Sequence, residues 1–221
     1  MSFGFLGAGA LGSNIARLLA ASGISATIAN SRGPETLANL VRELGPSITA
    51  GTSTEAASAE IVFVALRWAD LAGALRNLPY WGGRIAIDAT NAVAFLAPGS
   101  PDSKDPNNPL AAYGIKAIDL GATYSSNVFR ALVPGARVVK AFNHLEADLL
   151  REPSTSEGRR VLFYAGDDTD AKAEVCGIVN QTGFLPIDLG ALDVGGRLMA
   201  LPFGPLAGVD LVKREEDTRA G

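Results

Sequence analysis

The stretch that decides the fold lies near the N-terminus and reads Ser2-Phe-Gly-Phe-Leu-Gly-Ala-Gly-Ala-Leu-Gly12. A short apolar run, residues 2–7, ends in glycine, and an amphipathic helical pattern follows at once. Gly7, Gly9 and Gly12 therefore have G-x-G-x-x-G spacing in a strand–turn–helix setting, which argues against a turn that merely needs glycine. The first glycine permits a tight turn, the second lets backbone approach a pyrophosphate, and the third lets helix and strand pack closely. The free N–H groups of the helix N-terminus attract the same anion, so the stretch predicts a dinucleotide-binding fold.

Strands and helices alternate along the rest of the chain. Strands are expected at residues 25–30, 48–51, 60–66, 84–88, 137–142, 160–165 and 184–188, and helices at 35–44, 68–78, 125–132 and 169–182. This alternation predicts an α/β protein with a Rossmann-type, doubly wound, mainly parallel sheet. The proline-rich residues 95–112 are too long for an ordinary connection and are expected to form a functional or mobile loop. We expect a dinucleotide-binding Rossmann domain over 1–150, a small C-terminal α/β extension over 151–212 packed on it, and a flexible tail over 213–221.

The end of the second expected strand indicates which dinucleotide binds. An NAD-binding fold places Asp or Glu there to bond the ribose 2′-hydroxyl, but this chain has Asn30, followed by Ser31 and Arg32. A carboxylate would repel a 2′-phosphate, whereas a guanidinium can bond it bidentately and a serine hydroxyl can add a donor. NADP(H) is therefore the expected cofactor. Its phosphates are assigned to Gly7, Gly9, Ala10, Leu11 and Gly12, and its adenosine ribose to Asn30, Ser31 and Arg32.

Composition excludes several other classes of function. The chain has 221 residues, 48% of them hydrophobic and 19% charged, with a net charge of −4, so no strong field attracts nucleic acid or an anionic membrane. One cysteine rules out an internal disulfide framework, and one histidine well separated from it offers no metal-ligand cluster. The N-terminal residues lack the pattern of a signal peptide or a membrane helix, so a cytoplasmic protein without membrane insertion is expected.

Motifs spread over nearly the whole chain resemble those of one known group. Besides Gly7–Gly12 and Asn30-Ser-Arg32 they are Val138-Val-Lys-Ala-Phe-Asn143, Gly166-Asp-Asp168, Pro186-Ile-Asp-Leu-Gly190 and Gly196-Arg197. The chain resembles the NADPH-dependent reductases of the deazaflavin coenzyme F-420, a group to which the cytoplasmic domain of STEAP-type ferric reductases is related. The resemblance implies hydride transfer between NADP(H) and a flavin or deazaflavin stacked on the nicotinamide, in which the protein positions and shields two cofactors. FMN, FAD and coenzyme F-420 are the expected acceptors, and the resemblance implies a homodimer. The tail is shorter than in the archaeal deazaflavin reductases, which leaves room for ordinary flavin.

Site residues follow from the same resemblance. It implies that Leu66 and Arg67 border the ribose and diphosphate and that Thr90 and Asn91 approach the nicotinamide ribose. The nicotinamide itself is expected against the strand end that contains Ala141, Phe142, Asn143, His144 and Leu145. His144 has two interpretations, because many relatives have threonine there. With an ordinary pKa it would stabilise or protonate a reduced flavin; otherwise it is bonded to backbone and shapes a pocket wall.

Three functions remain open at this point. The leading hypothesis is an NADPH-dependent flavin or deazaflavin oxidoreductase with a small-molecule electron acceptor, one that can also pass electrons to ferric iron. The second is an NADPH-dependent dehydrogenase of a small carbonyl compound, although the chain lacks a serine–tyrosine–lysine constellation and a large helical substrate domain. The third is an NADP-sensing module without turnover, since a cradle alone does not establish catalysis.

Overall fold

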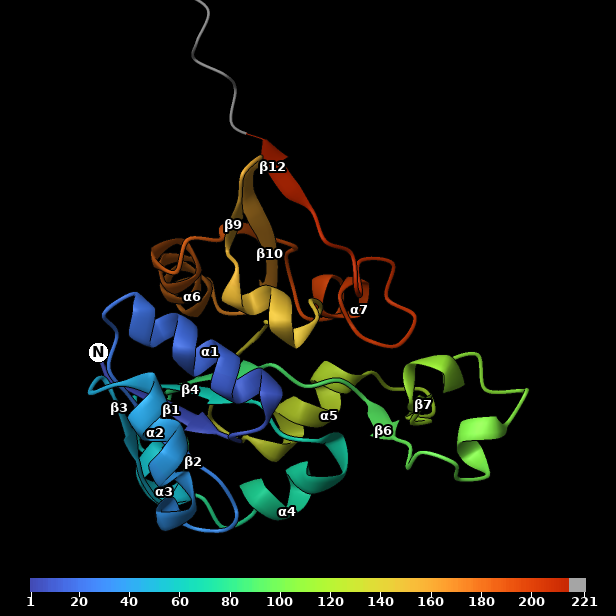
Figure 1. Cartoon of the computed structure of the whole chain (residues 1–221), viewed down its shortest axis with the longest axis horizontal. Helices are drawn as coiled ribbons and strands as arrows, with labels where there is room; N and C mark the ends of the chain where they lie inside the picture. The colour runs from blue at the N-terminus through green and yellow to red at the C-terminus, as the bar shows by residue number, and fades with distance from the viewer. Residues whose placement is uncertain (215–221) are drawn as a thin grey trace, which may run out of the picture.

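The computed structural model describes residues 1–214 and is built around one central sheet (Figure 1). Its strands run in the order β11-β10-β8-β5-β4-β1-β2-β3. All neighbours from β8 to β3 are parallel, β10 is antiparallel to β8, and β11 is parallel to β10. The expected Rossmann-type, mainly parallel sheet is confirmed. The strands are β1 (Phe3–Leu6), β2 (Ala26–Ala29), β3 (Ile48–Ala50), β4 (Ile61–Val64), β5 (Ile85–Asp88), β8 (Arg137–Ala141), β10 (Gly158–Gly166) and β11 (Leu185–Asp188).

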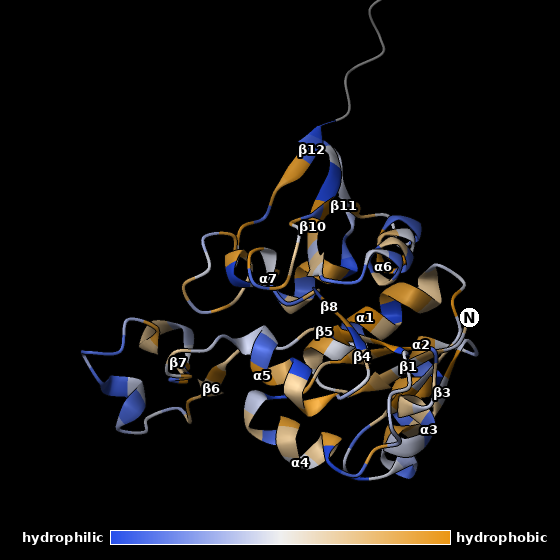
Figure 2. Cartoon of the chain, turned by 180° about the vertical axis from the view of Figure 1, so that it is seen from behind, coloured by the Kyte–Doolittle hydropathy of each residue, from blue (hydrophilic) through white to orange (hydrophobic). Residues whose placement is uncertain are grey.

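Helices cover both faces of the sheet, and each face has its own apolar core. One face packs against α1 (Ala10–Ala21), α2 (Ala38–Leu44), η5 (Ala147–Arg151) and α6 (Thr169–Gln181). The other packs against α3 (Ser53–Ala57), α4 (Leu71–Leu75), α5 (Ser125–Leu132) and α7 (Gly195–Leu198). Figure 2 shows the hydrophobic colour concentrated on the strands and on the helix sides that face them. Because both faces are buried, the strands read as continuous apolar runs.

Two of these helices begin differently from the sequence expectation. Short 3₁₀ turns, η1 (Pro34–Leu37) and η2 (Trp68–Asp70), precede α2 and α4. Helix α3 was not expected; it begins at a capping box in which Thr52 and Glu55 bond each other's backbone N–H groups. It lies so close to β1 that a Cβ on Gly4 would be 1.9 Å from the Ala56 carbonyl oxygen, so the strand needs glycine there.

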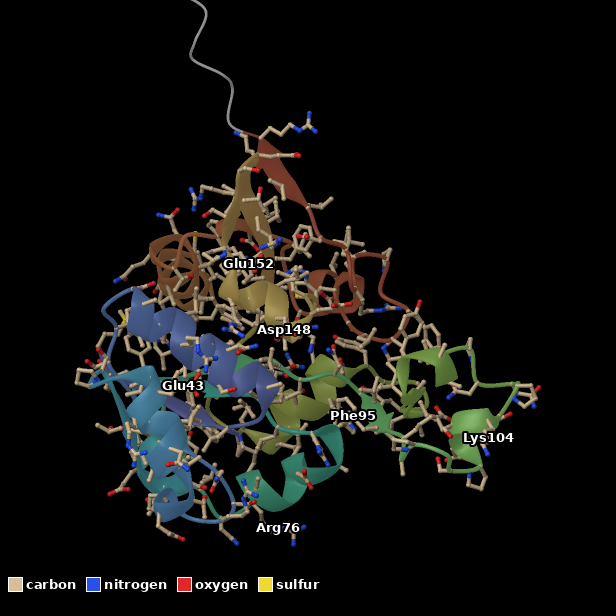
Figure 3. All side chains as sticks on the ribbon, in the orientation of Figure 1. Glu43, Arg76, Phe95, Lys104, Asp148 and Glu152 are labelled. Atoms are coloured by element: carbon tan, nitrogen blue, oxygen red, sulfur yellow. The ribbon has the colours of Figure 1, made fainter. Side chains whose placement is uncertain are left out.

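The proline-rich stretch forms an arm that projects from the body (Figures 1 and 2). Strands β6 (Val93–Phe95) and β7 (Ile115–Ala117) pair antiparallel at its base, and two 3₁₀ turns, η3 (Asp102–Lys104) and η4 (Ala111–Tyr113), lie farther out. Figure 3 shows Phe95 near the body and Lys104 on the outer part of the arm. The stretch is thus partly ordered where an irregular loop was expected.

The C-terminal residues extend the main sheet beyond β8. β9 (Ser154–Thr155) and β12 (Val212–Arg214) both pair antiparallel with β10. Lys213 and Arg214, expected in a flexible tail, therefore belong to a strand, and the rest of that tail, 215–221, lies outside the described residues. No helix within residues 1–214 is long and apolar enough to cross a membrane.

Candidate functional site

A cleft of about 840 Å³ opens at the carboxyl ends of β1, β2 and β4, where doubly wound sheets bind their ligands. Its walls come from the turn after β1, the loop after β2, the loop after β4 and the start of α4. Arg32 and Arg67 contribute positive charge from two different loops, and Asp70 is the one carboxylate among the lining residues. The lining therefore has a small net positive charge, which suits a ligand rich in phosphate.

The three glycines of the first turn differ in what they touch. A Cβ on Gly7 would lie 2.3 Å from the Ala65 carbonyl oxygen, and Gly7 has a φ of +107°, which favours glycine. A Cβ on Gly12 would lie 2.1 Å from the Gly7 carbonyl oxygen. A Cβ on Gly9 would meet no heavy atom within 4 Å among the described residues. The fold itself thus requires Gly7 and Gly12, while Gly9 leaves space open at the cleft.

Helix α1 points its N-terminus at that space. Gly9 is its N-cap residue, no side chain caps it, and its first turn contains no acidic residue. The first N–H groups of a helix have no partner within the helix, so those of Ala10 and Leu11 remain available to an anion beside the cleft. An open position at Gly9 next to these donors is the geometry that a diphosphate needs.

The loop after β2 holds Arg32 by its backbone and leaves its side chain exposed. Asn30 Oδ1 accepts a hydrogen bond from the Arg32 backbone N–H at 2.9 Å, and Asn30 Nδ2 donates to Thr36 Oγ1 at 2.9 Å. The Ser31 and Arg32 side chains are exposed, and Arg32 forms no ion pair with any described residue. The Asn30 amide is thus committed to the loop, and Ser31 and Arg32 supply the groups that can reach a 2′-phosphate.

The loop after β4 forms the opposite wall. Leu66 and Arg67, which the family resemblance implies as neighbours of the ribose and diphosphate, both line the cleft. The Arg67 guanidinium also lies 5.7 Å from the ring centroid of Phe95, at the base of the arm (Figure 3). This cation–π contact joins the arm to the rim of the cleft.

A buried ion pair lies under the carboxyl ends of β5 and β8. Lys140 Nζ donates to Asp88 Oδ2 at 2.9 Å, and both side chains are 0% exposed. Together they bind every polar group of Thr90: Asp88 Oδ1 accepts from its N–H and its hydroxyl, and Lys140 Nζ donates to its carbonyl at 2.8 Å. Thr90 is therefore a fixed part of the structure, and its side chain is bound inside the protein rather than free for a ribose.

Two asparagines, Asn91 and Asn143, join the segments that follow β5 and β8. Asn91 Nδ2 donates to the Asn143 carbonyl at 2.7 Å, and Asn143 Nδ2 donates to Asn91 Oδ1 at 3.0 Å. Both then reach the C-terminal segment, where Asn143 Nδ2 donates to the Met199 carbonyl and Asn91 Oδ1 accepts from the Leu201 N–H. The structure thus brings Thr90, Asn91 and Asn143 together and adds residues 199–201 to them; their contact with a nicotinamide stays a prediction.

Three residues expected to line the nicotinamide face the core. Ala141 and Phe142 are fully buried and Leu145 is nearly so, and all three pack in the same apolar cluster as α1. The Phe142 ring meets Phe63 edge-on at 5.6 Å between centroids. Because β8 is covered on both faces, these residues can offer only backbone to a cofactor. Phe142 has a φ of +64°, an unusual value for a residue with a side chain.

His144 is buried and bonded to backbone. Its Nε2 accepts a hydrogen bond from the Phe163 N–H at 3.0 Å, so the proton of the neutral ring is on Nδ1. Burial lowers the pKa of His144 to about 4, against a smaller opposing effect of Asp210. The expectation of an ordinary pKa near working pH is therefore wrong. These contacts favour the pocket-wall interpretation over a catalytic one.

Lys140 was missed in the sequence as a functional candidate. Its signal was present, because a lysine inside the apolar run Val138-Val-Lys-Ala-Phe142 must find a buried partner. The parallel pairing of β5 with β8 places Lys140 directly opposite Asp88, which supplies that partner. The contacts of Met199 and Leu201 had no comparable signal.

Comparison with known proteins places the chain among nicotinamide-dependent enzymes. The family profile described as “NADP oxidoreductase coenzyme F420-dependent” matches residues 2–92. The crystal structure of a hypothetical protein from Sinorhizobium meliloti is 36% identical, with a TM-score of 0.84, and the match covers 96% of each chain. An Arthrobacter protein described as an F420-dependent NADP reductase is 25% identical, with a TM-score of 0.69, over 87% of this chain and 86% of that one.

A more distant structure shares the fold. A reductive aminase from Aspergillus terreus, solved with NADPH and ethyl-5-oxohexanoate, is 20% identical with a TM-score of 0.57. The match covers 88% of this chain but 56% of the aminase. The common part is the dinucleotide-binding fold, and the aminase has a large additional portion that this match does not reach.

Proposed function

We propose that this chain, which belongs to the family of coenzyme F420-dependent NADP oxidoreductases, transfers a hydride between NADP(H) and a flavin or deazaflavin ring. The observation that carries the cofactor assignment is the open position at Gly9, between the uncapped N-terminus of α1 and the exposed Arg32. The fold does not require glycine there, so close approach of a diphosphate supplies the reason. Bound NADPH supplies the hydride itself.

Each part of the cleft has a distinct task in this proposal. The N–H groups of Ala10, Leu11 and Gly12 bind the diphosphate, and Gly7 forms the turn that directs them. Ser31 and Arg32 bind the 2′-phosphate, with Asn30 holding their loop in place. Leu66 and Arg67 form the opposite wall and border the ribose and diphosphate.

The polar groups under β5 and β8 position the nicotinamide end. The Asp88–Lys140 pair fixes Thr90, so the following Asn91 is presented in one orientation. Asn91 and Asn143 then hold two strand ends and the C-terminal segment at one separation. Hydride transfer depends on alignment to within a fraction of an ångström, and the bonds that join both strand ends to the C-terminal segment supply it.

An acceptor panel tests this proposal. Purified protein is mixed with NADPH, and absorbance at the NADPH band is followed after adding FMN, FAD, the deazaflavin coenzyme, ferric chelates and carbonyl compounds in turn. Turnover with a flavin or the deazaflavin is the expected result. Turnover confined to carbonyl compounds would replace it with the dehydrogenase hypothesis, and tight NADPH binding without any turnover would leave the sensing module.

The proposal extends to the assembly and the location of the protein. We expect a homodimer in the cytoplasm, able to pass electrons from reduced flavin to ferric iron. Light scattering behind a sizing column tests the dimer, with twice the 22.8 kDa chain mass as the expected value. Reduction of ferric chelates only when flavin is added would support the onward step.

A further inference from the structure

The C-terminal segment 199–208, here called the acceptor loop, is bonded to the sheet at the far end of the cofactor site. Asn143 Nδ2 donates to the Met199 carbonyl at 2.9 Å, and the Leu201 N–H donates to Asn91 Oδ1 at 3.0 Å. The Gly208 N–H donates to the His144 carbonyl at 2.7 Å. All three bonds go to residues that follow β5 or β8, so the loop is held beside those two strand ends.

Strand order places the reactive end of the cofactor near this loop. The 2′-phosphate site follows β2 and the diphosphate site follows β1, so the dinucleotide crosses β4 toward β5 in the order β2-β1-β4-β5. From β2 to β5 is three strand spacings, about 14 Å. The nicotinamide end therefore points at the residues to which the acceptor loop is bonded.

Phe203 stands out in the acceptor loop. Its side chain is 74% exposed, and its φ of +74° is unusual for any residue other than glycine. The turn is tight, since a Cβ on the following Gly204 would lie 2.6 Å from the carbonyl oxygens of Leu198 and Ala200. Phe142, next to Asn143, is the other non-glycine residue with positive φ among the described residues. Strained residues of this kind cluster at ligand sites, and packing gives no reason for an exposed phenylalanine here.

We infer that the acceptor loop forms the acceptor's side of the site and that Phe203 offers the ring face on which a planar, multi-ring acceptor stacks. This inference rests on the proposed function and specifies which part of the acceptor is recognised. The loop sequence, Met199-Ala-Leu-Pro-Phe-Gly-Pro-Leu-Ala-Gly208, contains no charged residue. Its side chains therefore suit a ring rather than a phosphate or a carboxylate, because none of them carries a charge to pair with an anion. Riboflavin, which lacks the phosphate, is expected to use it as FMN does.

Variants of the full chain test this assignment. Phe203→Ala removes the ring, Phe203→Trp keeps an aromatic face, and Tyr113→Ala removes an equally exposed ring (78% exposed) from the arm as a matched control. Binding of FMN and of riboflavin is followed by quenching of flavin fluorescence in the presence of NADP⁺. NADPH binding is titrated separately, and steady-state kinetics with each flavin give KM and kcat.

The expected result is loss of flavin recognition alone. Phe203→Ala weakens binding of FMN and riboflavin to the same extent, by about tenfold, and raises KM for both while NADPH affinity stays unchanged. Phe203→Trp and Tyr113→Ala bind both flavins like the parent protein. Unchanged flavin binding in Phe203→Ala, or an equal loss in Tyr113→Ala, would overturn the assignment of Phe203 and leave the proposed function standing. If the parent protein neither binds nor reduces FMN, riboflavin or the deazaflavin coenzyme, both the assignment and the proposed function are wrong.

Discussion

Replacing Gly9 by alanine should separate cofactor binding from folding. Gly9 has an ordinary φ of −77°, and its added Cβ would meet no described atom within 4 Å. Alanine restricts the unfolded chain, which raises the free energy of unfolding by about 0.4–1 kcal/mol. Alanine is also a poorer helix N-cap than glycine, which lowers the free energy of unfolding by about a few tenths to 1 kcal/mol. The free energy of unfolding should therefore change by no more than about 0.5 kcal/mol.

The same methyl group should greatly weaken NADPH binding. A diphosphate oxygen bonded to the α1 N–H groups approaches to about 2.9 Å, and a methyl at Gly9 occupies the space beside it. Loss of one charge-assisted hydrogen bond costs about 1.5–3 kcal/mol, which is about tenfold to a hundredfold in the dissociation constant.

Gly12→Ala provides the contrasting variant. Its Cβ lies 2.1 Å from the Gly7 carbonyl oxygen, so the two atoms must separate by about 1.3 Å to reach the ordinary contact distance of 3.4 Å. Overpacking against main chain costs about 3 kcal/mol, and the better helix propensity of alanine returns about 1 kcal/mol. A net loss of about 2 kcal/mol lowers Tm by about 4–8 °C.

Both variants are measured by thermal unfolding without cofactor and by fluorescence titration with NADPH. Gly9→Ala should have the Tm of the parent protein and a lower affinity for NADPH, whereas Gly12→Ala should have a lower Tm. Parent-like NADPH affinity in a folded Gly9→Ala protein would refute the assignment of this glycine to the diphosphate. A large fall in its Tm would refute the claim that the fold leaves the position free.

Three further changes test the rest of the site. Arg32→Ala should raise KM for NADPH by about tenfold to a hundredfold and leave KM for NADH unchanged, because it removes a charge-assisted phosphate contact; an equal effect on both contradicts the NADP assignment. Lys140→Met should lower the free energy of unfolding, measured by urea titration, by about 3–5 kcal/mol, because it leaves Asp88 buried and unpaired. The double variant Asp88→Asn, Lys140→Met should recover part of this lost free energy, because the buried charge is then removed as well. Since the pKa of His144 is lowered from 6.5 to about 4, the unfolded state takes up its proton first as pH falls. The parent protein should thus lose about 3 kcal/mol of stability between pH 6.5 and pH 4, a loss that His144→Gln does not share.

The parts of the fold that the sequence predicts are those defined by local patterns. Helix α5 has the expected bounds, 125–132, and the parallel strands from β1 to β8 differ from expectation by a few residues at their ends. Helix α3 was not predicted because its five residues are too few to show a helical period, although Thr52 and Glu55 have a capping-box pattern. The pairing of β10 with the edge of β8 depends on contacts distant in sequence, so periodicity gave no sign that residues 158–188 extend the main sheet.

The candidate site likewise has one part that local sequence predicts and one part that depends on contacts distant in sequence. Gly7, Gly9, Gly12 and Arg32 lie within one β-α-β unit, where spacing along the chain fixes position in space. The structure places Gly7, Gly9 and Arg32 in the lining of one cleft and packs Gly12 against the Gly7 carbonyl. At the other end the contacts cross the chain: Asn91 meets Asn143, 52 residues away, and Leu201, 110 residues away. A single sequence contains no signal for such pairs.

This asymmetry has a functional consequence. In the proposed function, the half of the site built from local sequence holds the cofactor, whose chemistry is common to many dinucleotide-binding proteins. The half built from long-range contacts is the one that we assign to the acceptor, and it contains a fully buried ion pair and two phenylalanines with positive φ, features that cost stability. Neither feature improves stability over an apolar alternative, so each is explained by the need to hold two strand ends and the acceptor loop at one distance. Substitutions that change acceptor choice without affecting NADPH should therefore fall in residues 199–208. Those that affect both should fall at Asn91 and Asn143, because these two asparagines join the strand ends after β5 and β8 to the acceptor loop.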